Sequence, residues 1–339
     1  MGKTVILAVA GSGKTAKIID LLNAESRILI VTYTINNIEN LKVRIISKFG
    51  FMPQNIRLFS YFTFLYSFCY KPFLHLKLST TGINFEPCKN PYAKELARYI
   101  GKDGRLYSNR IAKLLEQEGV MNEVVSRLSK YFDYILIDEI QDFGGHDFNL
   151  LKYVTNAEAD IVFVGDYYQH TFDTSRDGNV NVNLHSDYNK YKKAFSSIGL
   201  ELDLTSLNKS YRCSPTICDF IADSLEIDIQ SHRQDAVRIV TVEDQALVDA
   251  IFVNNDIVKL FYRESYKYSG YTKNWGETKG DDMYHDVCVA LNNKTLGSFK
   301  KNELASLPAQ TKSKLYVAIT RTRNDLYFVP EKMLKKYKA

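Results

Sequence analysis

A glycine-rich turn between an apolar run and a helical pattern restricts the fold more than any other feature of the sequence. The apolar run covers Val5–Ala10, the turn reads Gly-Ser-Gly-Lys-Thr, and the helical pattern continues to Leu22. A strand, a glycine loop and a helix in this order form the arrangement that a phosphate-binding loop requires. The backbone N–H groups of such a loop point inward, and the helix N-terminus adds partial positive charge. The sequence therefore predicts a site for a nucleoside triphosphate.

Each residue type in this loop suits one part of phosphate binding. Gly11, Ser12 and Gly13 are expected to present their backbone N–H groups to the phosphates. Lys14 is expected to reach the β- and γ-phosphates, and Thr15 to offer its hydroxyl oxygen to Mg²⁺. The alternative is an ordinary strand-to-helix turn that happens to contain this pentapeptide. The strand and helix patterns on either side make that alternative the weaker interpretation.

The composition is typical of a globular protein. The chain has 339 residues, of which 45% are hydrophobic and 24% are charged, and its net charge is +5. These values predict one large or two medium domains, and the positive charge suits a polyanionic partner. No apolar run reaches membrane-spanning length, no signal peptide precedes the loop, and the five cysteines form no C-x-x-C pair. A cytoplasmic protein with reduced thiols and no membrane association is therefore expected.

A second buried-strand pattern, Arg27–Thr32, lies between two helical patterns, the later of which extends to about Lys48. Alternating strands and helices indicate an α/β domain with a parallel sheet. Loops at the carboxyl ends of such strands form the ligand-binding edge. Thr32, Tyr33 and Thr34 are therefore expected at that edge, and a polar loop without a ligand is the alternative.

The strand–helix alternation is interrupted between about residues 71 and 119, where prolines and glycines recur. Short helices fit Tyr92–Ile100 and Asn109–Glu118. The alternation resumes afterwards, so this stretch is expected to be an inserted subdomain. The aromatic run Tyr61–Tyr70 before it is too dense to assign residue by residue, and most of it is expected in the core.

Two carboxylates follow the next buried-strand pattern. Tyr134–Ile137 leads directly into Asp138 and Glu139, at a point where the chain must turn for both acids to be used. Asp138 is expected to hold Mg²⁺, and Glu139 to orient and deprotonate the attacking water. An acidic surface turn is the alternative. Gln169 follows a further strand pattern, Ile161–Val164, and could sense the γ-phosphate without competing for the metal.

Seven segments in one order resemble the motifs of the UvrD/Rep-like superfamily 1 helicases. No single match would suffice, but the seven together extend from the first strand pattern almost to the last. The segments are Ala8–Thr15 (A-x4-GKT), Ile30–Thr34 (resembling TFTN), Asp138–Asp142 (DExQD), Gly165–Gln169 (GDxxQ), Ser210–Ser214 (resembling NYRS), Lys279–Asp282 (resembling KGLE) and Tyr316–Arg323 (resembling YVAxTRAR).

This resemblance implies two RecA-like P-loop NTPase domains with parallel sheets and ATP in the cleft between them. The first domain would cover residues 1–203, with the short helical insertion at about 71–119, and the second would cover residues 204–339. Strands are expected near Val237–Val242, Ile257–Tyr262, Val287–Leu291 and Leu326–Val329, and a helix at Pro215–Leu225.

The resemblance also implies roles for residues at the nucleotide. Tyr211 would stack on adenine, and Arg212 and Arg321 would act as catalytic arginines on the triphosphate. Lys14, Glu139 and Gln169 complete the expected catalytic set. Residues that would approach or link the nucleotide are Gln141, Gly280 and Asp282.

Nucleic acid would lie across the tops of both domains. Aromatic stacking and hydroxyl contacts to phosphate are independent of sequence, as a translocating enzyme requires. Core packing is the alternative for each aromatic residue. The candidate contacts are Thr32, Tyr33, Thr34, Thr63, Phe172 and Trp275.

Two functions from different classes follow. The first is an ATP-dependent translocase or helicase that acts on single-stranded DNA, by family resemblance in the 3′ to 5′ direction, with RNA as a further possible track. The alternative is a nucleic-acid-stimulated ATPase that remodels or signals within a larger complex, with protein partners, without processive unwinding. Only 66 residues (213–278) separate Arg212 from Lys279, where large family members carry an accessory subdomain, and this favours the alternative.

Overall fold

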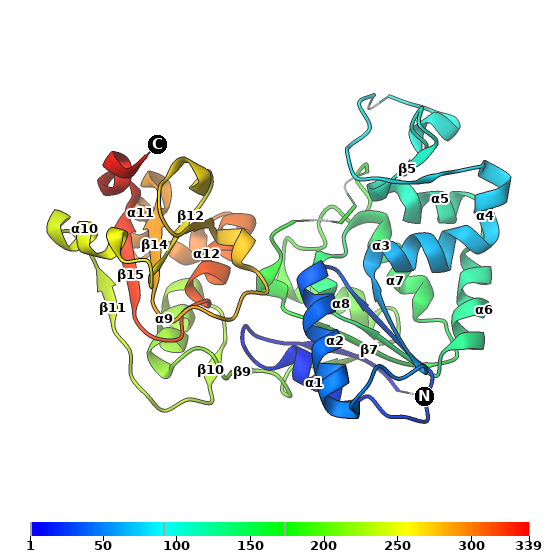
Figure 1. Ribbon diagram of the computed structural model, residues 1–339, viewed down its shortest axis with the longest axis horizontal. Coiled ribbons are helices and arrows are strands. Elements are labelled where there is room, and N and C mark those ends of the chain that lie inside the picture. The colour runs from blue at the N-terminus through cyan, green and yellow to red at the C-terminus, as the bar shows by residue number, and fades with distance from the viewer. Residues whose placement is uncertain (1, 91, 173, 176, 339) are drawn as a thin grey trace. The chain divides into compact units, whose positions relative to one another are not determined.

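The computed structural model describes residues 2–90, 92–172, 174–175 and 177–338, and these form two compact units (Figure 1). The N-terminal unit comprises residues 1–6, 15–165 and 172–203. The C-terminal unit comprises residues 204–339 together with two short segments from earlier in the chain, Leu7–Lys14 and Asp166–Thr171. The expected phosphate-binding loop therefore groups with the C-terminal unit by its contacts, although it follows a strand of the N-terminal sheet.

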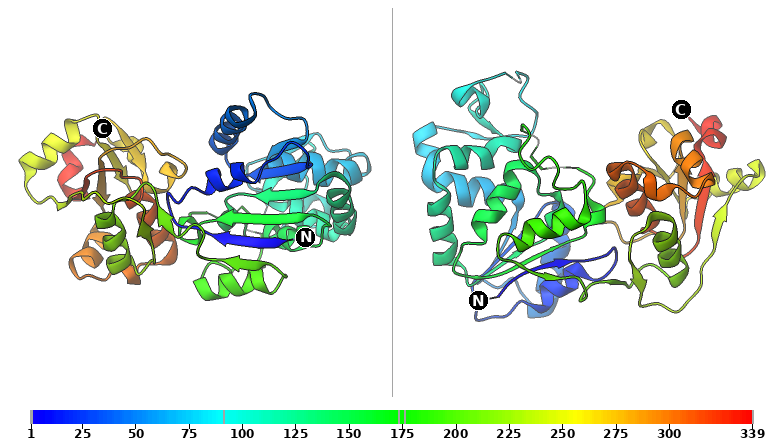
Figure 2. Two further views of the ribbon diagram at one scale, coloured as in Figure 1. Left: turned by 90° about the horizontal axis from the view of Figure 1, so that it is seen from below. Right: turned by 180° about the vertical axis from the view of Figure 1, so that it is seen from behind.

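The N-terminal unit is built on a six-stranded sheet whose strands point the same way (Figure 2, left). Two neighbouring strands that carry the sequence signal have buried apolar residues, since Ile28–Val31 and Ile135–Leu136 have no exposed surface. Crossover helices return the chain between parallel strands. In their order across the sheet, the strands are β3 (Ile56–Ser60), β2 (Ile28–Thr32), β6 (Tyr134–Ile137), β7 (Asp160–Gly165), β1 (Lys3–Leu7) and β8 (Glu201–Asp203).

Helices and a small two-stranded sheet complete this unit. The helices are α1 (Lys14–Asp20), α2 (Ile35–Phe49), α3 (Tyr61–Thr63), the π-helix η1 (Phe64–Tyr70), α4 (Lys71–Leu78), η2 (Glu95–Arg98), η3 (Ser108–Arg110), α5 (Ile111–Gln117), α6 (Met121–Tyr131), η4 (Ile140–Asp142), α7 (Gly145–Val154) and α8 (Tyr188–Ser196), and the small sheet is β4 (Gly82–Asn84) with β5 (Arg105–Tyr107).

One buried carboxylate contributes to holding the inserted stretch to the rest of the unit. Asp177 receives hydrogen bonds from Arg98, Arg110 and Lys113, all of which belong to the insertion. Burial alone would raise the pKa of Asp177, but the hydrogen bonds from Lys113 and Arg98 outweigh it and lower the pKa. Removing this carboxylate would leave buried arginine charge without a counter-ion, which is strongly destabilising.

The C-terminal unit has its own five-stranded sheet, in which every neighbouring pair is parallel. In sheet order, the strands are β11 (Ile239–Thr241), β15 (Leu326–Pro330), β14 (Val287–Leu291), β12 (Val258–Phe261) and β13 (Thr272–Asn274). The remaining elements are η5 (Tyr167–Gln169), β9 (Lys209–Ser210), α9 (Pro215–Leu225), β10 (Gln230–Ser231), α10 (Gln245–Val253), η6 (Ser265–Lys267), η7 (Trp275–Thr278), α11 (Asn293–Lys300), η8 (Leu304–Ser306), α12 (Ala309–Ile319) and η9 (Glu331–Tyr337).

The expected fold class, α/β with parallel sheets and a short helical insertion, is confirmed. Two local expectations were wrong. The segment 92–100 forms only the 3₁₀ turn η2, and β8 was not expected at all because its three residues carry no apolar pattern. Within the described residues, none of the helices is long and apolar enough to cross a membrane.

Candidate nucleotide and nucleic-acid sites

The glycine loop has the backbone that its sequence predicts. It follows β1 and ends where α1 begins at Lys14, and Gly11 and Gly13 have left-handed φ values of +71° and +91°. A side chain at Gly11 would also collide with its neighbours, since an added Cβ would lie 2.7 Å from Cβ of Arg212. Glycine is required at this position both by the backbone and by the close approach of the Arg212 segment.

The loop is fixed within the C-terminal unit by hydrogen bonds to three segments. The N–H of Tyr211 donates to the Gly11 carbonyl at 2.9 Å, and the N–H of Val9 donates to the Leu207 carbonyl at 2.9 Å. The N–H of Ala10 donates to the hydroxyl of Tyr316 at 2.9 Å. Lys14 and Thr15 remain half-buried, so both side chains keep access to a ligand.

Tyr316 connects this loop to the segment after β7. Its hydroxyl accepts the Ala10 N–H and donates to Oδ2 of Asp166 at 3.3 Å. Oδ2 of Asp166 also accepts the side-chain amide of Gln169 at 2.7 Å. Burial, followed by the negative charge of Asp166, raises the pKa of Tyr316 well above its usual value, so the phenol keeps its proton. Sequence reasoning missed this role of Tyr316, although the tyrosine lies in a recognised motif.

The two expected catalytic carboxylates leave the end of β6 inside a polar network. Asp138 and Glu139 are 3% and 6% exposed. Asp138 accepts a long hydrogen bond of 3.4 Å from the hydroxyl of Thr32, which ends β2. Glu139 accepts from the side-chain amides of Gln141 and, at 3.5 Å, of Asn37. The parallel pairing of β2 with β6 explains why these groups meet at one edge of the sheet.

The backbone turns sharply at Glu139, whose φ is +56°. A non-glycine residue in the left-handed region costs on the order of 1–3 kcal/mol, and such strain is concentrated at functional sites. The turn lets Asp138 and Glu139 leave the strand on one side instead of on opposite faces. The sequence predicted a turn at this point, and the positive φ is its structural form.

Gln141 lies against the end of β7. It is fully buried, and a Cβ added to Gly165 would lie 2.4 Å from Oε1 of Gln141. The glycine that opens the Gly165–Gln169 segment is therefore needed because no side chain fits beneath the glutamine. This contact brings the segments that follow β6 and β7 together at the sheet edge.

The two expected catalytic arginines are engaged inside the C-terminal unit. Nε of Arg212 donates to Oδ1 of Asp282 at 2.6 Å, and Nη1 donates to the Thr320 carbonyl at 3.1 Å. Asp282 also pairs with Arg323 at 3.1 Å. The structure thus brings together two residues, Arg212 and Asp282, that were expected to contact the nucleotide separately.

Arg321 is 2% exposed and donates to three carbonyls, those of Val317, Thr278 and Asp281, at 2.8–3.2 Å. Gly280, with φ +88°, lies in the turn that these bonds hold. Burial, followed by the positive charge of Arg212, lowers the pKa of Arg321 to about 10, so the guanidinium stays charged at neutral pH.

The expected adenine-stacking residue is accessible. The side chain of Tyr211 is 61% exposed, and its ring stacks on His232 with a centroid distance of 4.0 Å and an interplanar angle of 13°. His232 was not identified from the sequence. It supports the tyrosine ring in a fixed orientation, as a stacking platform requires.

Aromatic rings gather at the carboxyl ends of β2 and β3 in the N-terminal unit. The ring centroid of Tyr33 lies 5.1 Å from that of Phe172 and 5.7 Å from that of Phe62. The ring centroids of Phe62 and Phe85 lie 4.9 Å apart. Burial, followed by the charges of Asp142 and Asp147, raises the pKa of Tyr33 to about 12. Sequence reasoning missed Phe62 and Phe85. A hollow of about 280 Å³ beside these rings is lined by Tyr33, Phe62, Phe85, Pro87, Ser108, Asn109 and Thr174.

The structure contradicts two of the expected nucleic-acid contacts. Trp275 is fully buried in the core of the C-terminal unit, and its indole N–H donates to the Leu260 carbonyl at 2.9 Å. Thr32 is also fully buried, because its hydroxyl faces Asp138. Thr34 caps α2 by accepting the Asn37 N–H, and only Thr63 of the expected threonines is exposed.

Comparison with known proteins agrees with this fold. The model of the UvrD/REP helicase N-terminal domain matches residues 90–186. No curated protein sequence matches the chain. The structure of arterivirus nonstructural protein 10 (helicase) with DNA has a TM-score of 0.51, at 13% identity over 98% of this chain and 63% of the other. The arterivirus protein crystallised as "nonstructural protein 10 (helicase)" gives a TM-score of 0.50, at 13% identity over 98% and 62%.

The chain spans about three fifths of the length of these arterivirus helicases. At this identity the structural likeness establishes the fold alone, and the match to the helicase domain covers residues 90–186. Together, these findings show a match to the UvrD/REP helicase N-terminal domain over residues 90–186 and a fold similar to that of the arterivirus helicase.

Proposed function

We propose that this protein hydrolyses ATP and couples the hydrolysis to movement along single-stranded DNA. The observation that carries the proposal is the polar edge of the N-terminal sheet. There β6 delivers Asp138 and a left-handed Glu139 to the same edge at which β1 leads into the glycine loop. Carboxylates at a sheet edge and a phosphate-binding loop are the two groups that phosphoryl transfer to water requires.

In this proposal the residues divide the work as follows. The backbone N–H groups of Gly11–Gly13 and the Lys14 ammonium bind the β- and γ-phosphates. Glu139, oriented by Gln141 and Asn37, accepts the proton of the attacking water. Gln169 responds to the γ-phosphate, and its bond to Asp166 connects that response to Tyr316. Arg212 and Arg321 neutralise negative charge that develops in the transition state.

The donor set fits Mg²⁺. The hydroxyl of Thr15 and the carboxylate of Asp138 are hard oxygen ligands, and Mg²⁺ is bound by one or two such groups plus substrate phosphates. Bound Mg²⁺ would neutralise charge on the β- and γ-phosphates. The hydroxyl of Thr32 donates a long hydrogen bond of 3.4 Å to the Asp138 carboxylate at this sheet edge.

The nucleotide base would rest on Tyr211, whose ring is exposed and supported by His232. Gly280 and Asp282 lie in segments bonded to Arg321 and Arg212, so a change at the triphosphate would reach them through these bonds. The track would be single-stranded DNA in the 3′ to 5′ direction, and its bases would stack on the platform of Tyr33 and Phe172.

A second candidate function is supported by a specific observation. The 66 residues between Arg212 and Lys279 form only α9, β10, β11, α10, β12, η6, β13 and η7, which are elements of the C-terminal fold itself. A compact chain of this kind could use ATP to remodel or signal within a larger complex, in response to nucleic acid, without processive unwinding.

Paired measurements separate the two functions. ATP hydrolysis should be recorded with and without single-stranded DNA or RNA, beside strand displacement from a partial duplex. The Lys14→Ala variant should lose hydrolysis in every condition, because it lacks a phosphate ligand. Stimulation by DNA with displacement supports the motor, whereas stimulation without displacement supports the remodelling ATPase. If neither nucleic acid stimulates hydrolysis, both functions are wrong.

A further inference from the structure

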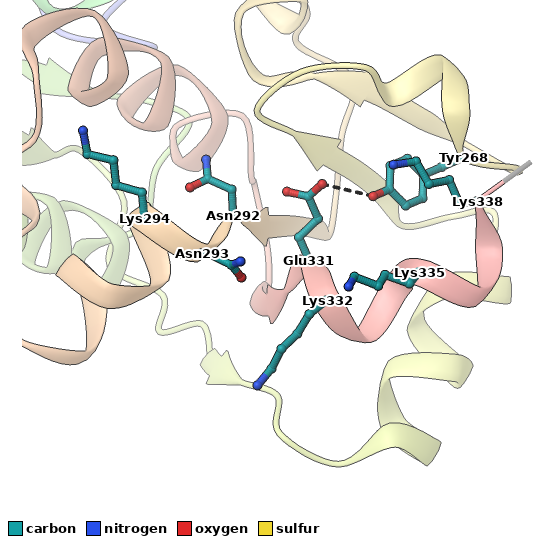
Figure 3. A pocket seen from close by; sticks show the side chains of 8 residues that line it. All are labelled: Tyr268, Asn292, Asn293, Lys294, Glu331, Lys332, Lys335 and Lys338. Carbon is teal, nitrogen blue, oxygen red and sulfur yellow. Dashed lines mark hydrogen bonds between the residues drawn. The ribbon is translucent and has the colours of Figure 1, made fainter.

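A basic pocket opens at the carboxyl edge of the C-terminal sheet, among residues that the proposed nucleotide site does not use (Figure 3). Its volume is about 380 Å³. Strands β14 and β15 are parallel neighbours in a register that pairs Leu291 with Pro330. The residues that follow the two strands therefore emerge side by side. The lining is Tyr268, Asn292, Asn293, Lys294, Glu331, Lys332, Lys335 and Lys338.

The charge of this pocket is unbalanced. Four lysines and one glutamate leave a net charge of +3 on its lining. The glutamate, Glu331, accepts a hydrogen bond from the Tyr268 hydroxyl at 3.0 Å. Among the residues that the structure describes, no carboxylate lies within ion-pair distance of the ammonium groups of Lys294, Lys332 or Lys335, and all three side chains are exposed.

The chemistry of the lining favours backbone phosphates over a free anion. Lysine is a strongly hydrated point charge that attracts phosphate without reading a base edge. The start of α11 is already capped, because Oδ1 of Asn292 accepts the Thr295 N–H at 3.0 Å. Affinity must therefore come from several ammonium groups at once. A strand of linked phosphates carries several charges along its length, whereas a single anion carries its charge at one point.

We infer that this pocket binds the sugar–phosphate backbone of the single-stranded nucleic acid on which the protein acts, as a contact separate from the aromatic platform of the N-terminal unit. The inference rests on the proposed function and adds a named binding surface to it. The rings of Tyr33 and Phe172 stack on bases, and the lysine pocket binds the phosphates of the nucleic acid electrostatically. Both contacts are independent of the nucleotide sequence.

The test compares two matched variants of the full chain. Lys332→Gln/Lys335→Gln removes two charges from the pocket. Lys336→Gln removes one charge from the same helix, η9, but Lys336 pairs with Asp249 and does not line the pocket. Binding of a fluorescent single-stranded DNA should be measured between low and moderate salt, with inorganic phosphate and anionic lipid vesicles as separate probes.

The double variant should bind DNA roughly tenfold more weakly near 0.1 M salt, with the slope of log K against log salt reduced by about 1.4, since each phosphate contact on a single strand contributes about 0.7. The Lys336 variant should keep the wild-type slope. The concentration of DNA that half-saturates ATP hydrolysis should rise in the double variant, and hydrolysis at saturating DNA should be unchanged.

Wild-type slope and affinity in the double variant would overturn the inference and leave the proposed function standing. So would a loss confined to phosphate or vesicle binding, because the ligand would then be a free anion or a membrane surface. If the wild-type protein binds no nucleic acid, the proposed function itself is wrong and the inference fails with it.

Discussion

The carboxyl edges of the two sheets carry different kinds of polar side chain. At the edge of the N-terminal sheet, β2 ends in Thr32 and β6 leads into Asp138, and these two buried residues are hydrogen-bonded to one another. At the edge of the C-terminal sheet, β14 and β15 lead into exposed lysines such as Lys294 and Lys332. Buried, hydrogen-bonded groups have fixed geometry and low dielectric surroundings, which suit catalysis, whereas exposed charges are screened by salt and suit reversible adhesion.

The same contrast separates groups within the C-terminal unit. Arg212 and Arg321 are nearly as buried as Asp138, whereas the pocket lysines are exposed, although all are basic. Burial in the fold, and not charge alone, therefore predicts which basic side chains act on a transition state and which bind a polyanion.

The largest effect is expected from Arg212→Ala. Loss of a catalytic arginine should lower kcat by about 10³–10⁵, as for arginine fingers, with little change in DNA affinity. Steady-state ATP hydrolysis and DNA binding on the same preparation provide the measurement. Because Arg212 also pairs with Asp282, an Asp282→Asn variant serves as the control for loss of the ion pair. A similar loss of kcat in both variants would show that the pair, and not the guanidinium, is what matters.

The next effect is expected from Glu139→Gln. The amide cannot accept the proton of water, so kcat should fall by about 10²–10⁴, the usual contribution of a general base. Nucleotide binding should persist, because the phosphates are held by the glycine loop. Nucleotide affinity from a fluorescent analogue and single-turnover hydrolysis test the two parts separately. Equal losses in binding and turnover would contradict the role of Glu139 as the base.

A buried group outside the proposed chemistry gives the third prediction. Asp147, in α7, is 1% exposed, and burial raises its pKa to about 7. The folded pKa lies above the unfolded value near 3.9, so the folded state binds the extra proton and stability falls as pH rises from about 4 to 7. Asp147→Asn should therefore raise the free energy of unfolding by about 2–4 kcal/mol at pH 8, and by less at pH 5.

Urea unfolding at the two pH values measures this difference, and hydrogen exchange of the α7 amides assigns it to the N-terminal unit. A gain of equal size at pH 5 and pH 8 would mean that the side chain acts through packing and not through its proton. ATP hydrolysis should be unaffected, because Asp147 is not placed among the groups proposed to contact the nucleotide.

A strand can be predicted from the sequence only where its run of apolar residues is long enough to recognise. Asp138 and Glu139 follow four apolar residues, three of which are buried, and that pattern placed them at a strand end. Four strands of the C-terminal sheet were anticipated from the resemblance to the helicase motifs. β8 was missed because three residues, Glu201–Asp203, carry no such pattern and pair only because β1 lies beside them.

Side-chain direction was harder to predict than position. Thr32 was correctly placed at the sheet edge, but its hydroxyl turns inward to Asp138, since the last residue of a buried strand can face either way. Trp275 was correctly placed near a motif but lies in the core, where its indole finds the Leu260 carbonyl. The links through Tyr316 and Asp177 join residues more than 60 positions apart, and nothing local in the sequence reports such a bond.

The smallest effect is expected from Tyr33→Ala. Loss of one stacking ring should weaken DNA binding by about 1–3 kcal/mol, or roughly 5–150-fold. Because the raised pKa keeps Tyr33 neutral, the ring contributes no charge, and the slope of log K against log salt should stay at the wild-type value. Tyr33→Phe keeps the ring and should retain affinity. If Tyr33→Ala lowers DNA affinity without changing the salt slope, and Lys332→Gln/Lys335→Gln lowers both, the two surfaces make physically different contacts. A changed slope in Tyr33→Ala would instead mean that the two surfaces hold the strand as one unit.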